Sequence, residues 1–402
     1  MPTLTKERDL ERGEVDARAV PEYSVHLDAV RGAAALLVFL VHARMFFLQS
    51  LLNHHRAVSA STLGPVASSS VHLSRTVRSD YAHQAVMVFF VLSGYLVGGS
   101  VLRSIHRNDW SWKRYLVHRT VRLWMVLVPA LILGLVFDLA GSHHFAGEGT
   151  IYSGPPGQDL IPPGLSNRLS PGTLLGNLFF LQTIRVTPLG TNQPLWSLAN
   201  EFWYYLACPC LMLSLLAPWS WWKRMLAIAG MGAILLFAGQ EIAWYFSIWL
   251  LGALAAWLPL KIPARQQRAF VFAALTIFLA GNLLVSYDHP NHFPVDFFLG
   301  ILFSILIYGL AHLRLPARNG IYRRSARFMS KISYSLYLTH GPVFCLMSAI
   351  LVGSWRLLPM GGHAVAVLAE ALTVAFLIAC TVHFLFESRT DRVRSYLEAR
   401  LR

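Results

Sequence analysis

The stretch "LDAVRGAAALLVFLVHARMFF", residues 27–47, has the length and apolarity of a helix that crosses a membrane. Two of its side chains do not suit a lipid surface: Arg31 near its start and His42 toward its end. On a straight helix these two residues are about 16 Å apart along the axis and only about 20° apart around it, so they share one face. A charge at mid-helix costs roughly 2.5–3.5 kcal/mol on insertion scales, so this face either lines a polar path or carries an Arg31 that snorkels to the membrane interface and a His42 packed against a backbone carbonyl. Asp28 is three residues before Arg31 and is placed to pair with it.

The rest of the chain has the composition of a membrane protein. Of its 402 residues, 55% are hydrophobic and only 13% are charged, about half the charged share of a soluble domain. We therefore predict an all-α polytopic membrane protein with about ten transmembrane helices. The predicted spans are 27–48, 83–102, 117–138, 197–216, 222–238, 241–258, 268–285, 294–312, 332–352 and 364–386. The run "TLLGNLFFLQT" at 173–183 is too short to cross and is predicted to be re-entrant or interfacial.

The basic residues predict how the chain is oriented. The net charge of +14 might suggest a nucleic-acid partner, but 26 of the 34 lysines and arginines fall in segments on one side of the predicted spans. This asymmetry follows the positive-inside rule and predicts cytoplasmic N- and C-termini, with no nucleic-acid partner. It divides the chain into a cytoplasmic tail (1–26), a transmembrane domain (27–388) and a basic cytoplasmic tail (389–402).

Two long loops, 49–82 and 139–196, fall on the opposite, outer side. The second contains "YSGPPGQDLIPPGLS" and is expected to be irregular. It is either a lid that binds an acceptor or a plain variable loop.

Metal and disulfide chemistry is not indicated. Every cysteine lies in an apolar run, where a small buried hydrophobe is expected, and "CPC" does not have zinc-ligand spacing. The pairs His54–His55 and His143–His144 are interpreted as solvated loop residues.

A carboxylate enters the fourth predicted span. In "QPLWSLANEFWYY", Glu201 lies about one turn into the helix from the outer side, a depth that matches His42. A carboxylate that orients an imidazole makes a histidine a general base or nucleophile. The alternative is that Glu201 complements the N-terminal helix dipole.

Further polar and aromatic side chains fall at or inside the spans. His340 in "ISYSLYLTHGP" lies a third to half way across the ninth span, and Ser93 is at the middle of the second. We expect a substrate path that includes Ser93, Trp196, Tyr337 and His340. Among these, Ser93, Tyr337 and His340 are candidates for stabilising an oxyanion. A small residue such as Ser93 also permits close helix packing, which is the competing interpretation.

The stretch "RYLVHRTVR", 114–122, begins the third span on the cytoplasmic side. Arg119 and Arg122 are three residues apart and share a helix face, so they are suited to clamp phosphates. Arg114 is interpreted as an ordinary positive-inside residue.

Taken together, these stretches resemble the acyltransferase-3 family of integral membrane O-acyltransferases over residues 24–390. The resemblance rests on an ordered set of motifs: "LDAVRG" followed by His42, "FFVLSGYL" at 89–96, Arg-x-x-Arg at 119–122, "PLWSLANEFWYY" at 194–205, "ISYSLYLTHGP" at 332–342 and "FESR" at 386–389. The chain departs from the family pattern at Asn200, where an aromatic or second acidic residue is frequent, and at 387–389, where the family has Glu-x-Pro.

The resemblance implies an enzyme that takes an acyl group, usually from acetyl-CoA, out of the cytoplasm to a glycan hydroxyl on the outer side. It implies that Arg31 and His42 are the essential pair and that Arg119 and Arg122 meet the donor phosphates. It also implies a bacterial inner-membrane protein whose partners are acyl-CoA, a hydroxyl acceptor and the lipid bilayer. His42 either accepts the acyl group itself or deprotonates the acceptor.

Other activities use a similar polar path. Within enzymes, these are succinyl or other acyl transfer to a periplasmic glucan, a macrolide or a lipid-linked sugar. Outside enzymes, the alternative is a transporter of an anionic solute.

Overall fold

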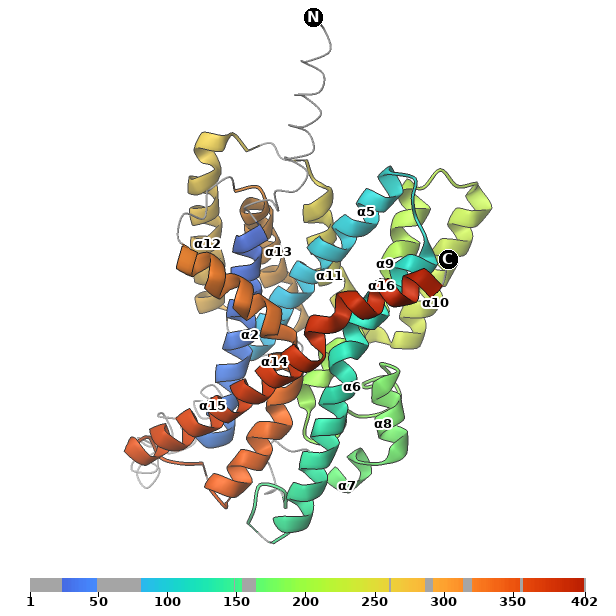
Figure 1. Cartoon of the computed structure of the whole chain (residues 1–402). Helices are drawn as coiled ribbons and strands as arrows, with labels where there is room; N and C mark the ends of the chain where they lie inside the picture. The colour runs from blue at the N-terminus through green and yellow to red at the C-terminus, as the bar shows by residue number, and fades with distance from the viewer. Residues whose placement is uncertain are drawn as a thin grey trace, which may run out of the picture.

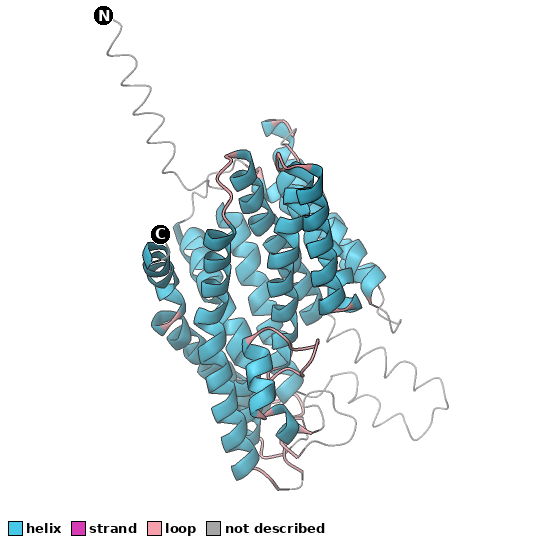
Figure 2. Cartoon of the chain, turned by 90° about the vertical axis from the view of Figure 1, so that its right-hand side faces the viewer, coloured by secondary structure: helices cyan, strands magenta, loops and turns pink. Residues whose placement is uncertain are grey.

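The computed structural model describes residues 24–48, 81–147, 149–153, 164–259, 262–285, 292–313, 320–354 and 357–400. Most of the predicted N-terminal tail and of the loop 49–82, with His54 and His55, lies outside these residues. The described part is a bundle of helices (Figures 1 and 2). Its β pairings are two isolated bridges, Leu48 with Leu358 and Gln182 with Val186.

Each of the ten predicted spans is a helix in the structure. The long helices are α2 (Ser24–Phe47), the helix Tyr81–His106 that ends in α5 (Gly99–His106), α6 (Trp112–His144), α9 (Trp196–Leu216), α10 (Trp221–Ala238), α11 (Gln240–Trp257), α12 (Gln267–Leu284), α13 (Phe293–Ala311), α14 (Gly320–Leu351) and α15 (Gly362–Leu385). Eight stretches are long and apolar enough to cross a membrane, and the helices α9 and α11 are not among them. In α9 the polar residues Ser197, Asn200 and Glu201 lower the hydropathy of the first turns, and α11 opens with Gln240 and Glu241.

The helices differ in how deeply they are buried. Helix α14 packs against α2, α6 and α15, and it is largely buried, as is the helix Tyr81–His106. Helices α10 and α12 lie at the periphery and expose large apolar side chains, among them Leu236 and Leu283. Such outward-facing apolar surface is what a helix in lipid presents.

Glycines bring the helix Tyr81–His106 and α11 into close contact. A Cβ added at Gly94 would lie 1.9 Å from the carbonyl oxygen of Trp249, and one added at Gly252 would lie 1.9 Å from that of Val91. At this crossing the first helix forms a π-helical turn, Gly94–Gly98. A π-turn shifts the register of the side chains that precede it relative to those that follow it. The small residues of "LSGYL" therefore permit the packing, and Ser93 at the start of the turn is left free to face α9.

At two prolines inside helices, a side chain from elsewhere in the chain donates the hydrogen bond that the proline cannot. Pro342 of α14 has no N–H to donate to the carbonyl of Leu338, and the Nδ2 of Asn192 donates to that carbonyl instead at 2.8 Å. A side chain also replaces the missing donor in α9, where Pro209 leaves the carbonyl of Tyr205 without its usual N–H partner. There the Tyr115 hydroxyl donates at 2.9 Å. Each proline thus ties its helix to a neighbouring element.

The segment predicted as an irregular loop at 139–196 is more ordered than expected, although 154–163 lies outside the described residues. Helix α6 continues to His144, and the segment contains α7 (Leu165–Arg168), α8 (Pro171–Leu178) and the short 3-10 helix η2 (Gln193–Leu195). The buried carboxylate of Asp138 accepts hydrogen bonds from the backbone N–H and the hydroxyl of Thr191 at 2.7 and 2.8 Å. Gly190 makes this approach possible, because its φ is +54° and a Cβ there would lie 2.0 Å from the carboxylate. The short α8 agrees with the prediction that 173–183 does not cross.

The predicted basic tail from 389 onward contains a helix, α16 (Thr390–Arg400), which lies along α6 (Figure 1). The His118 side chain of α6 contacts the carboxylate of Glu398. Just before α16, Glu387 accepts hydrogen bonds from the Ser335 hydroxyl at 2.6 Å and from Nδ1 of His383 at 3.0 Å. The carboxylate of the "FESR" motif thus connects α14 with α15.

Candidate active site

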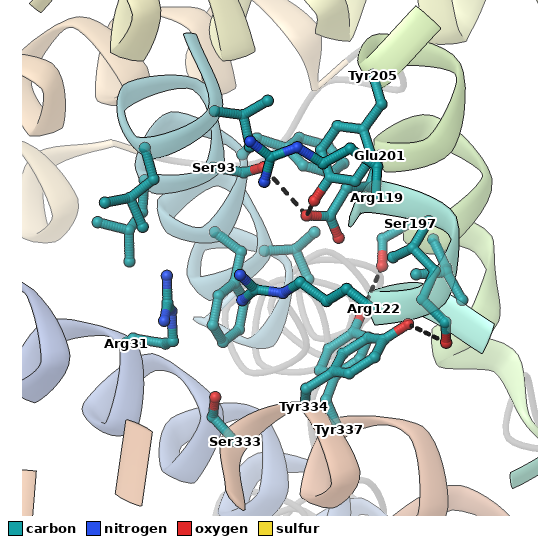
Figure 3. Close-up of a pocket in the computed structure, with 18 residues that line it drawn as sticks. Arg31, Ser93, Arg119, Arg122, Ser197, Glu201, Tyr205, Ser333, Tyr334 and Tyr337 are labelled. Atoms are coloured by element: carbon teal, nitrogen blue, oxygen red, sulfur yellow. Dashed lines mark hydrogen bonds between the residues drawn. The ribbon is translucent and has the colours of Figure 1, made fainter. Parts of the chain in front are cut away.

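Side chains from five helices surround one cavity in the middle of the bundle (Figure 3). The space between them, including its opening, is about 850 Å³, within the usual range for a binding site. The helices are α2, Tyr81–His106, α6, α9 and α14. The polar lining residues are Arg31, Ser93, Arg119, Arg122, Ser197, Glu201, Tyr205, Ser333, Tyr334 and Tyr337. Apolar side chains such as Phe89 and Leu96 fill the remaining wall.

The lining includes three arginines and one carboxylate, so its formal charge is positive. The guanidinium groups of Arg31 and Arg122 project from α2 and α6 into the same space (Figure 3). Arg31 donates to the Ser330 hydroxyl at 3.5 Å, and Ser330 donates in turn to the carboxylate of Asp28 at 2.7 Å. The predicted pairing of Asp28 with Arg31 is therefore bridged by a serine of α14.

Arg119 is held against two aromatic rings. Its Nη2 donates to the Ser100 hydroxyl at 2.6 Å, and its guanidinium carbon lies 5.3 Å from the ring centre of Tyr115 and 5.6 Å from that of Tyr205. These contacts fix the plane of the guanidinium without neutralising its charge. The prediction that Arg119 and Arg122 share a face is confirmed, since both line the cavity.

Glu201 lies in the cavity wall, but its partners differ from the expected one. Its Oε1 accepts a hydrogen bond from the Ser93 hydroxyl at 3.0 Å and another from the Tyr205 hydroxyl. Among the described hydrogen bonds, none joins Glu201 to His42. The expectation that Glu201 orients His42 is therefore not met, because α9 faces the π-turn at Ser93 instead of α2.

Four lining residues were not singled out from the sequence, namely Ser197, Tyr205, Ser333 and Tyr334. Their spacing from predicted residues is the signal that could have identified them. Ser197 and Tyr205 are four residues from Glu201 on either side, and Tyr334 precedes Tyr337 by three, so each pair shares a helix face. Within the wall, the Ser197 and Tyr337 hydroxyls are 2.8 Å apart and share a hydrogen bond.

His42 is paired with His340, which comes from α14. The Nδ1 of His42 is 2.7 Å from the Nε2 of His340, and the two rings are stacked with their centres 5.0 Å apart. The Nδ1 of His340 is 2.9 Å from the carbonyl oxygen of Leu336. A carbonyl only accepts, so Nδ1 of neutral His340 carries the proton and its Nε2 is an acceptor. His42 therefore donates from Nδ1, and its own Nε2 holds a lone pair.

The histidine pair lies beside the cavity. The side chains that line the cavity, taken from the described residues, include Tyr337 but neither His42 nor His340. The ring of Tyr337 is edge-on to that of His340, with centres 6.1 Å apart. Tyr337 therefore belongs to the cavity wall and to the surroundings of the pair.

Trp196 begins α9 at the edge of this site. Its ring is 6.1 Å from that of Phe90, a lining residue, and it stacks on His83 with ring centres 5.8 Å apart. Trp196 is thus separated from the cavity by one ring.

The exposed pair His143–His144 ends α6, and within the described ranges no three His, Cys, Asp or Glu side chains are grouped as metal ligands would be.

The sequence profile of the acyltransferase-3 family, described as an acyltransferase domain, matches residues 25–382. The chain is also similar to Nodulation protein 10 of Rhizobium leguminosarum bv. viciae, with 26% identity over 328 residues that cover 73% of this chain and 81% of that protein. No solved structure matches the chain. Because the family profile covers most of the chain, the protein belongs to the acyltransferase-3 family of membrane proteins and is an acyltransferase.

Proposed function

We propose that this protein transfers an acyl group, acetyl in the simplest case, from cytoplasmic acyl-CoA to a hydroxyl of a glycan on the outer side of a bacterial inner membrane. The observation that carries the proposal is the cavity into which helices of an apolar bundle direct three arginines and one glutamate. The bias of lysine and arginine supports ten spans with both termini in the cytoplasm. Nodulation protein 10 comes from a bacterium, which supports the proposal of a bacterial inner membrane.

The positive cavity suits the donor. Coenzyme A carries several phosphates, and guanidinium groups bind phosphate oxygens in a bidentate manner. Arg119 and Arg122 lie near the start of α6, on the side proposed to be cytoplasmic, and Arg31 is in the first third of α2. These residues would hold the phosphates, while the apolar wall around Phe89 and Leu96 accommodates the pantetheine arm.

The histidine pair supplies the base. With His340 holding its Nδ1–H, His42 presents an Nε2 lone pair. In the direct route, Nε2 takes the proton of the acceptor hydroxyl, the oxygen attacks the thioester carbonyl, and the carbon–sulfur bond breaks as the carbon–oxygen ester bond forms. The proton then passes to the departing coenzyme A thiolate.

In the second route, Nε2 attacks the thioester itself and carries the acyl group until the acceptor hydroxyl displaces it. Both routes give an ester and coenzyme A thiol. An adduct on His42 in the absence of acceptor distinguishes them.

Glu201, Ser93 and Tyr205 form a fixed unit in the wall. With two hydroxyl donors on its Oε1, Glu201 balances part of the arginine charge and orders the donor pocket. The one proton of the Ser93 hydroxyl is donated to Glu201, so the candidate for stabilising the thioester oxyanion is the Tyr337 hydroxyl, whose proton is available when Ser197 donates in their shared hydrogen bond.

The test is mass spectrometry of the full chain in detergent after addition of isotopically labelled acetyl-CoA. Wild type is compared with His42→Ala and with His143→Ala, a matched control at an exposed histidine that ends α6. We expect labelled turnover or an acetyl adduct in wild type and the control, and neither in His42→Ala. A His42→Ala enzyme with normal turnover would refute the mechanism.

The transporter alternative predicts a different result. A transporter binds its anionic solute without consuming the thioester, so coenzyme A would not be released from acetyl-CoA. Thermal stabilisation by coenzyme A without thioester consumption would favour that alternative.

A further inference from the structure

A second cluster of polar and aromatic side chains lies where several helices begin, outside the cavity. His83 stands near the start of the helix Tyr81–His106, and its Nε2 is 2.7 Å from Oδ2 of Asp296, in the first turn of α13. The Tyr245 hydroxyl of α11 donates to the same Oδ2 at 2.7 Å. One face of His83 stacks on Trp196, the first residue of α9, with ring planes 13° apart. Four helices thus contribute one side chain each.

The hydrogen bonds determine which nitrogen of His83 is available. The carboxylate of Asp296 accepts from Nε2–H, so in the neutral ring Nδ1 holds the lone pair. The Asp296 side chain is fully buried, whereas that of His83 is 29% exposed. Among the described hydrogen bonds, Asp296 is the partner of His83, and Nδ1 has none. A buried carboxylate therefore fixes a partly exposed ring that presents a hydrogen-bond acceptor.

The cluster lies at the opposite end of the cavity from the arginine that contacts Ser100. Along the helix Tyr81–His106, the lining residues run from Val86 to Val97, after which Ser100 contacts Arg119. His83 precedes Val86 by one turn, and at 1.5 Å per residue it lies roughly 25 Å from Ser100. Trp196 is followed directly by Ser197, which lines the cavity. The two ends of the cavity are therefore chemically distinct: one is cationic, the other aromatic with an acidic residue.

Aromatic rings continue outward from the cluster. Trp244, next to Tyr245 in α11, is 40% exposed, and its ring centre is 5.6 Å from that of Phe293. The ring of Phe293 also meets Tyr245 edge-on at 5.7 Å. Flat aromatic faces beside polar groups suit the apolar C–H face and the hydroxyl rim of a sugar ring. A phosphate or carboxylate ligand would be repelled by Asp296.

We propose that the side chains of His83, Asp296, Tyr245 and Trp196 form the acceptor-binding site and that the acceptor group it takes is a hydroxyl-bearing pyranose ring. This inference rests on the proposed function and identifies the second substrate's site. The Nδ1 of His83 accepts a hydrogen bond from a sugar hydroxyl, and Asp296 is a positioning residue that holds Nε2–H. No proton is transferred at this site.

The experiment uses the full chain in detergent, acetyl-CoA, and an equimolar mixture of 4-nitrophenyl glucoside, galactoside and N-acetylglucosaminide as acceptor probes. Transfer is followed by the mass of one added acetyl group. Coenzyme A release without sugar and thermal stabilisation by coenzyme A are measured in parallel as donor-side readouts. The variants are His83→Phe, which keeps a flat ring against Trp196 but has no nitrogen, and His83→Gln, which restores an acceptor oxygen. His143→Phe is the matched control.

We expect His83→Phe to raise the KM for the sugar about tenfold, the effect of one lost hydrogen bond, with the KM for acetyl-CoA and the coenzyme A stabilisation unchanged. His83→Gln recovers part of the loss, and His143→Phe matches wild type. A sugar KM within twofold of wild type in His83→Phe overturns the proposal. So does a loss of coenzyme A stabilisation in both His83 variants, which would make the cluster structural.

Failure of the proposed function gives a different pattern. Wild type would then not consume acetyl-CoA, whether or not coenzyme A stabilises it. If wild type consumes acetyl-CoA but acetylates none of the pyranosides, the enzyme remains an acyltransferase and the carbohydrate assignment of this site is wrong.

Discussion

Replacing His340 tests whether the second histidine sets the tautomer of the first. Its Nε2 is the acceptor for Nδ1–H of His42; the His340 side chain is fully buried and that of His42 is half-buried. In His340→Leu that donor loses its partner, and His42 is no longer held with its lone pair on Nε2. Loss of a buried hydrogen bond costs about 1–3 kcal/mol, which corresponds to a decrease in kcat of about 5- to 150-fold.

His340→Gln is the matched control. Its side-chain oxygen can accept from Nδ1–H of His42, so we expect kcat to stay within about threefold of wild type. Because His340 does not line the cavity among the described residues, neither substitution should change the KM for acetyl-CoA by more than about twofold.

The assay is steady-state release of coenzyme A thiol from acetyl-CoA by the purified protein, with thermal unfolding recorded for each variant. A leucine variant as active as the glutamine variant would refute the tautomer argument. A leucine variant with unchanged kcat and a raised KM for the donor would place His340 in donor binding instead.

Three further outcomes follow from the structure. Arg122→Gln should raise the KM for acetyl-CoA at least about tenfold with little change in folding, measured by kinetics and thermal unfolding; an unchanged KM would remove this arginine from the donor site. Asn192→Ala should lower the free energy of unfolding by about 1–3 kcal/mol, because the carbonyl of Leu338 is left without a donor, and Pro342→Ala should reduce this loss; equal losses in both backgrounds, measured in denaturing mixed micelles, would show that the two sites are not coupled. Gly94→Val should prevent folding, since its Cβ would meet the carbonyl oxygen of Trp249 at 1.9 Å, and a variant that elutes as a folded monodisperse species would contradict the packing described.

The sequence predicts the helices well because hydropathy and length are local properties. All ten predicted spans are helices, and the shared face of Arg31 and His42 follows directly from helical geometry. Of the four residues predicted to lie on the substrate path, Ser93 and Tyr337 line the cavity, whereas Trp196 and His340 lie beside it. What the sequence pattern could not supply is which helices meet.

The partner of His42 illustrates this limit. It depends on the packing of α2 against α14, between residues 298 positions apart in the chain, and a matched depth suggested Glu201 instead. The ordered segment after α6 was also missed, although Ser170 followed by Pro171 is a standard helix start: Ser170 accepts from the N–H of Thr173 and caps α8. Its glycines and prolines had suggested irregular backbone.

The hydrogen bonds from His42 through His340 determine where a proton can go in the proposed mechanism. The chain runs through His340 and ends at the carbonyl of Leu336, which has no proton to release and does not pass one onward. In the proposed mechanism a proton that enters at Nε2 must therefore leave by Nε2, from hydroxyl to thiolate. Under the proposed function, these hydrogen bonds do not conduct protons away from His42, so acyl transfer between the two faces of the membrane would not dissipate the proton gradient across it.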